Sequence, residues 1–124
     1  MKINAGSAQP VQQLEGRTPR WLAHASLGAA GTALLENVIA SAGAVPPHSH
    51  PMEELLVCQE GDGQLVACPH RYPFRPGDTA IIGAEEVQSI ENTGAAPLRL
   101  LGFFPSARPT AQMAVDGPPL LVER

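Results

Sequence analysis

Two histidines and two glutamates lie within seven residues of the chain, in the segment HSHPMEE at positions 48–54. The whole chain has only four histidines. Because side chains alternate across a strand, His48 and His50 share one face, and their imidazoles can reach one ion. Glu54 has the same parity, but four residues of straight strand would place it roughly 13 Å away. We therefore expect the chain to bend at Pro51, which has no N–H for a central strand, and to return Glu54 on the next strand.

This combination of residues suits a metal site. Two histidines and a carboxylate form a set that holds Zn, Fe, Mn or Ni. The alternative is a structural role, since a single histidine is more often a satisfied core residue and a surface glutamate is usually solvated. The spacing alone leaves both interpretations open.

The elements that must position these residues are short apolar runs between turn residues. The turns are indicated by EGDG at 60–63, RPGD at 75–78 and NTGAAP at 92–97. The flanking glycine and β-branched residues of LLENVIA favour a strand there over a helix. Strands at this spacing predict an all-β sandwich or barrel. The predicted strands span 33–42, 53–59, 63–69, 71–74, 78–83, 85–92 and 97–104.

The composition of the chain argues against several classes of function. The 124 residues suffice for one domain, and no apolar run approaches the roughly 20 residues of a membrane span. The first residues lack the apolar segment of a secretory signal, so we expect a cytoplasmic protein. The net charge is −4, and the seven arginines and one lysine are scattered, which argues against nucleic acid as a partner.

The two ends of the chain are rich in proline and alanine. We expect extended arms at 1–20 and 105–124. Their apolar residues, such as Leu120, Leu121 and Val122, should pack against the body or a second subunit, because open strand edges invite pairing.

From Gly43 to Asn92 the chain resembles a cupin. The first family motif, G-x5-HxH-x3,4-E-x6-G, is present with four rather than five residues before its first histidine, at Gly43, His48, His50, Glu54 and Gly61. The second motif, G-x5-PxG-x2-H-x3-N, is matched in outline by Gly77 and Asn92. It departs from the family at three positions: proline is replaced by Gly83, glycine by Glu85 and the last histidine by Gln88.

The resemblance implies a fold and a ligand set. The fold is a double-stranded β-helix, an antiparallel jelly roll of two sheets, forming one cupin domain over 1–124 and a homodimer. The ligands of one divalent transition metal (Mn, Fe, Ni or Zn) would be His48, His50, Glu54 and Gln88. An amide oxygen is a weaker donor than an imidazole. A three-ligand site with a looser fourth position, or a site that has lost its metal, are therefore alternatives.

For function, the resemblance implies a metal-dependent enzyme that acts on a small carboxylate- or carbonyl-bearing molecule, as a dioxygenase or as an isomerase or lyase. No separate acid or base is evident. The alternative is a non-catalytic module that binds a small molecule or senses metal, because the fold alone does not fix the chemistry.

The remaining candidates are weaker. Cys58 and Cys68 are expected to be unpaired core residues, with Cys58 facing the barrel interior. His70 should be exposed in a hairpin turn. His24 lies in an amino-terminal strand and could reach the pocket.

Two further expectations concern the run PLRLLGFF. Phe103 and Phe104 are neighbours and must point to opposite faces of a strand. The head of Arg99 should reach solvent from the outer face, and an anchor for a substrate carboxylate is the alternative.

Overall fold

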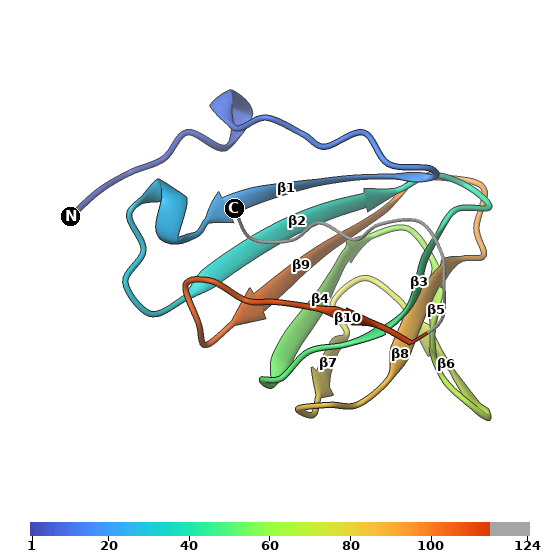
Figure 1. Cartoon of the computed structure of the whole chain (residues 1–124). Helices are drawn as coiled ribbons and strands as arrows, with labels where there is room; N and C mark the ends of the chain where they lie inside the picture. Colours follow the sequence, from blue (N-terminus) through green and yellow to red (C-terminus); the bar gives the residue numbers. More distant parts are fainter. Residues whose placement is uncertain (115–124) are drawn as a thin grey trace.

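Two five-stranded antiparallel sheets form the body of the molecule (Figure 1). The computed structural model describes residues 1–114. One sheet has the order β1-β2-β9-β4-β7 and the other β10-β3-β8-β5-β6. The all-β jelly roll expected from the sequence is confirmed. The strands are β1 (Arg17–Ala23), β2 (Ala33–Ile39), β3 (Ala44–Ser49), β4 (Glu54–Glu60), β5 (Gly63–Ala67), β6 (His70–Phe74), β7 (Thr79–Ile82), β8 (Gln88–Asn92), β9 (Leu98–Phe104) and β10 (Gln112–Met113). Two short 3-10 turns, η1 (Gly6–Ala8) and η2 (Ala25–Leu27), flank β1.

The seven apolar runs correspond to β2 and to β4 through β9. LLENVIA is a strand, as expected, and β2 ends before the predicted boundary because Ala40 accepts a backbone hydrogen bond from Gly43 and turns the chain. Strand β1 begins inside the expected amino-terminal arm, and β10 lies inside the expected carboxyl-terminal one. Strand β1 is an edge strand, where Pro19 is tolerated. Leu120, Leu121 and Val122 lie outside the described residues.

The glycine that opens the first motif has a steric role. A Cβ on Gly43 would lie 2.4 Å from the carbonyl oxygen of Gly16, so no larger residue fits where the start of β3 passes the start of β1. Asn92, which closes the second motif, is also structural. Its Nδ2 donates to the carbonyls of Ile39 and Ala96, both at 2.9 Å, and its Oδ1 accepts from the amide of Gly94.

The apolar core lies between the two sheets. Four core residues also line a cavity that contains the histidines: Val45, Leu56, Ile90 and Leu100. They separate the densely packed part of the interior from the polar part. The other core residues are Ile39, Cys58, Leu65, Phe74, Ile82 and Leu98. Within residues 1–114, no helix is long and apolar enough to cross a membrane.

Candidate metal centre

His48 and His50 come from the end of β3, where the strand is irregular. The register between β3 and β8 shifts between Val45 and His48, so Pro46 and Pro47 of β3 stand opposite a single residue of β8, Ser89. Such a bulge changes the direction of the side chains that follow it. The two prolines of AVPPHS, which cannot donate ladder hydrogen bonds, explain why the regular pairing fails here. As a result, both imidazoles are buried and line the same cavity.

Backbone carbonyls fix the orientation of both rings. His48 Nδ1 lies 2.8 Å from the Pro46 oxygen, and His50 Nδ1 lies 2.8 Å from the Thr110 oxygen. A carbonyl oxygen only accepts, so each Nδ1 carries the proton and each Nε2 has a lone pair. Metal-binding histidines are commonly held in this way. Burial lowers the pKa of His48 to about 4 and also lowers the pKa of His50, so both rings are neutral at pH 7.

Glu54 approaches the histidines from the opposite sheet. It is the first residue of β4, and its Oε1 lies 3.5 Å from His50 Nε2. Burial raises the pKa of Glu54 to about 8, so the carboxyl group keeps its proton at pH 7 unless a cation is close. Gly102 in β9 makes room for this group, because a Cβ there would lie 2.6 Å from Glu54 Oε2. The carboxyl group is thus buried beside an imidazole lone pair.

Gln88 faces His48 across the β3–β8 pair. Its side-chain Nε2 lies 3.0 Å from His48 Nε2 and donates to the lone pair of that ring. Its Oε1 is buried and has no hydrogen-bond partner among the described residues. A half-turn of the amide would exchange the two atoms and bring the oxygen to the His48 side. Gln88 therefore offers a neutral oxygen donor that no residue of 1–114 uses.

The donor set suits a divalent transition metal. It contains two neutral imidazoles with lone pairs on Nε2, a buried carboxyl group and an amide oxygen without a partner. No three His, Cys, Asp or Glu side chains of residues 1–114 are grouped closely enough to hold an ion as they stand. An ion held by these residues would require their side chains to move closer together.

The cavity beside the histidines is small, about 60 Å³, and mostly apolar. Two of its polar residues were missed in the sequence. The Arg17 side chain is buried and donates through Nη1 to the Ala44 oxygen at 3.2 Å. Asn37 Oδ1 is buried and has no hydrogen-bond partner in the described part of the chain. The sequence did contain a signal for Asn37. Neighbouring residues of a strand point to opposite faces, so either Glu36 or Asn37 had to face the interior.

The cysteines divide between interior and surface. Cys58 is in the core, as expected, whereas Cys68 is exposed, so its assignment to the core was wrong. The reason is that Cys68 lies in the tight turn between β5 and β6, where no second layer covers it. Neither cysteine forms a disulfide. His70 follows this turn and is exposed, as expected.

The other expectations concern the two faces of the first sheet. Phe104 lines the cavity and Phe103 is exposed, which confirms their opposite orientations. Arg99 lies away from the cavity and forms ion pairs with Glu36 and Glu60. His24 is buried, but it lines a second, larger cavity beside β1 and not the cavity of His48 and His50.

Comparison with known proteins supports this architecture. The family described as "Cupin domain" matches residues 35–104, which include all four candidate ligands. No curated protein sequence matches the chain.

Similar solved structures include three enzymes. The polyketide cyclase RemF from Streptomyces resistomycificus has a TM-score of 0.80 and 22% identity, covering 94% of this chain and 87% of that one. A sugar phosphate isomerase from Silicibacter pomeroyi has a TM-score of 0.77 and 18% identity, covering 94% and 83%. Lactobacillus farciminis oxalate decarboxylase has a TM-score of 0.79 and 19% identity, covering 87% of this chain and 34% of that one. At these identities the likeness shows the fold alone.

Proposed function

Because the chain belongs to the cupin family, we propose that it binds one divalent transition metal, Mn, Fe, Ni or Zn, at His48, His50, Glu54 and Gln88. The observation that carries this proposal is the pair of hydrogen bonds that the two Nδ1 atoms donate to backbone carbonyls, which leaves both Nε2 atoms unprotonated in one buried cavity. The pKa of Glu54, raised by burial to about 8, adds support, because a cation would compensate for burying the ionised carboxylate.

We further propose that the protein is a metal-dependent enzyme for a small oxygen-bearing molecule, as a dioxygenase or as an isomerase or lyase. The named relatives act on such compounds, a polyketide, a sugar phosphate and oxalate. A bound divalent ion would supply a Lewis acid for a substrate carboxylate or carbonyl oxygen. The residues of this chain would fix the ligand rings through Pro46 and Thr110 and exclude water with the apolar wall.

A non-catalytic module that binds a small molecule or senses metal is the second candidate. The observation that favours it is the volume beside the histidines, about 60 Å³, which holds only a small group. Turnover of a substrate would rule it out, whereas metal binding alone would not.

The proposal extends to the whole chain. We propose that 1–124 is a single cupin domain and that the protein is a cytoplasmic homodimer. Exposed apolar side chains on edge strands support self-association, since uncovered edges invite pairing.

Elemental analysis tests the metal site. The wild type should carry about one equivalent of a divalent first-row metal per chain. His50→Ala should lose the metal and its contribution to thermal stability, because a ligand that binds only the folded state stabilises it. The matched control is His70→Ala, an exposed histidine that should retain both. Less than about a tenth of an equivalent, not recovered after adding Mn, Fe, Ni or Zn, would contradict the proposal.

A further inference from the structure

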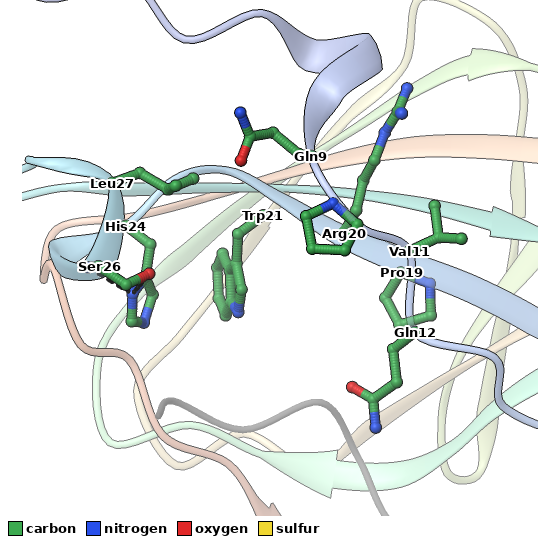
Figure 2. Close-up of a pocket in the computed structure, with 10 residues that line it drawn as sticks. Gln9, Val11, Gln12, Pro19, Arg20, Trp21, His24, Ser26 and Leu27 are labelled. Carbon is green, nitrogen blue, oxygen red and sulfur yellow. Dashed lines mark hydrogen bonds between the residues drawn. The ribbon is translucent and has the colours of Figure 1, made fainter.

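A second cavity of about 420 Å³ opens at the edge of β1, between the strand, the amino-terminal segment and η2 (Figure 2). The volume lies within the range of small-molecule sites, about 300–1,000 Å³. Its lining residues are Gln9, Pro10, Val11, Gln12, Pro19, Arg20, Trp21, His24, Ser26 and Leu27. No step of the proposed metal chemistry uses this space.

Aromatic rings form one wall of the cavity. The centroids of Trp21 and His24 are 4.7 Å apart. The amide of Ser26 donates to His24 Nδ1 at 3.1 Å and so fixes the second ring. Figure 2 shows both rings pointing to the same side of β1. The rings are tilted by 41°, and His24 is 1% exposed whereas Trp21 is half-buried, so Trp21 supplies the ring that a ligand can contact.

The same wall leads to the metal site. Trp21 contacts Phe104, with centroids 6.2 Å apart, and Phe104 contacts His50 at 4.9 Å. Pro19 lines both cavities. Ring contacts through Trp21 and Phe104 therefore connect the wall of the larger cavity with His50.

Gln12 provides a specific polar contact. Its side-chain Oε1 is buried and has no hydrogen-bond partner among the described residues. Its backbone amide donates to the Pro19 carbonyl at 2.8 Å, which holds the residue against β1. A buried acceptor without a donor is unfavourable, and a ligand with a hydroxyl or N–H group would satisfy it.

The charge of the lining argues against an anionic ligand. Arg20 is the only lysine or arginine among the lining residues, and its Nε donates to Glu36 Oε1 at 2.8 Å. In Figure 2 its side chain extends away from the side to which Trp21 points. The cavity thus offers the Trp21 ring and a hydrogen-bond acceptor, whereas its arginine is already paired with a carboxylate.

We infer that this cavity binds a small aromatic molecule that packs against Trp21 and donates a hydroxyl or N–H hydrogen to Gln12 Oε1. This site goes beyond the proposed function, because none of the candidate metal ligands lines its cavity. Binding itself requires no metal, so the two proposals can fail separately.

The only tryptophan of the chain lies in this cavity, which gives a direct measurement. Chelator-treated, ¹⁵N-labelled protein is titrated with 2-naphthol, which has a hydroxyl donor, and with 2-methoxynaphthalene, which has none. The indole N–H resonance of Trp21 should shift saturably with 2-naphthol, and the dissociation constant should be about tenfold lower than that for 2-methoxynaphthalene. An unchanged resonance with 2-naphthol, or equal constants for the two probes, would overturn the inference.

Two neighbouring glutamines provide matched variants. Gln12→Leu should abolish the preference for 2-naphthol, whereas Gln13→Leu, at an exposed position outside the cavity lining, should keep it. Equal behaviour of the two variants would contradict the role of Gln12, and the amide spectrum reports whether each variant is folded. Because the titration uses metal-free protein, a failed metal analysis leaves this result intact, and a failed titration leaves the metal site intact.

Discussion

At the scale of single residues, Gln88 decides how complete the candidate metal site is. If its amide oxygen is a ligand, Gln88→His should bind metal more tightly, because imidazole is the better donor to late first-row ions. Gln88→Leu should weaken binding without unfolding the chain, since Leu has a similar size and removes a buried oxygen that has no partner in the described part of the chain. Competition with a chelator measures all three affinities.

One result with the Gln88 variants would contradict its role as a ligand. If the wild type and both variants bind metal with the same affinity, Gln88 is a pocket wall and the site consists of His48, His50 and Glu54. Thermal unfolding of the metal-free proteins is the control, because it separates a lost ligand from a lost fold.

The two thiols should differ strongly in reactivity. Cys68 is exposed, whereas Cys58 is 1% exposed and burial raises its pKa, which disfavours the reactive thiolate. With Ellman's reagent, we expect about one equivalent of thiol in the native protein and about two in guanidinium chloride. Cys68→Ser should remove the native signal. Equal rates for both thiols in the native wild type would contradict the burial of Cys58.

At the scale of elements, β9 controls the position of the carboxyl group on β4. Gly102→Ala would place a Cβ 2.6 Å from Glu54 Oε2 and displace the carboxyl group. We expect metal affinity to fall by about 10–100-fold, as for other changes that misplace a ligand. The contact is with the end of a side chain, so the fold should be retained. Gly31→Ala, where a Cβ meets nothing within 4 Å, is the control. Unchanged affinity in Gly102→Ala would show that Glu54 is not positioned by this contact.

Strands with continuous apolar runs could be predicted from the sequence, because burial on a sheet imposes that pattern. Strands β2, β4 and β9 are of this kind. Strand β1 was partly hidden because Pro19 and two arginines interrupt its pattern. An edge strand tolerates proline and arginine. The position of β1 at the edge, however, depends on its pairing with residues of β2 farther along the chain.

The site was predictable to the same limited degree. Local spacing predicted that His48, His50 and Glu54 lie close together, with a bend at Pro51, and the structure places all three beside one cavity. Their role as ligands stays a prediction. Arg17 and Asn37 could not be assigned to the cavity, because only the register of β1, β2 and β9 brings them beside the histidines. The exposure of Cys68 likewise depends on where β5 ends: the strand stops at Ala67, and Cys68 lies in the turn that follows.

At the scale of the whole molecule, the two open edges of the barrel differ in character. Strand β1 borders the larger cavity, with its ring wall and the Gln12 oxygen. Strands β6 and β7, at the other ends of the two sheets, carry exposed apolar residues instead. Tyr72 is 52% exposed and Ile81 is 71% exposed, and both line one shallow hollow. The first edge therefore suits a small ligand, and the second suits a protein surface.

This second edge leads to the prediction of a homodimer. The wild type should sediment at twice the 13.0 kDa mass of the chain, and Ile81→Asp should sediment as a monomer, because a charge at the centre of an apolar contact must be desolvated. Val11→Asp is the matched control: Val11 is also exposed, at 44%, but lies beside β1, and this variant should remain dimeric. Sedimentation at micromolar concentration measures all three. A monomeric wild type would refute the dimer, and a monomer produced by Val11→Asp alone would place the interface on the amino-terminal arm.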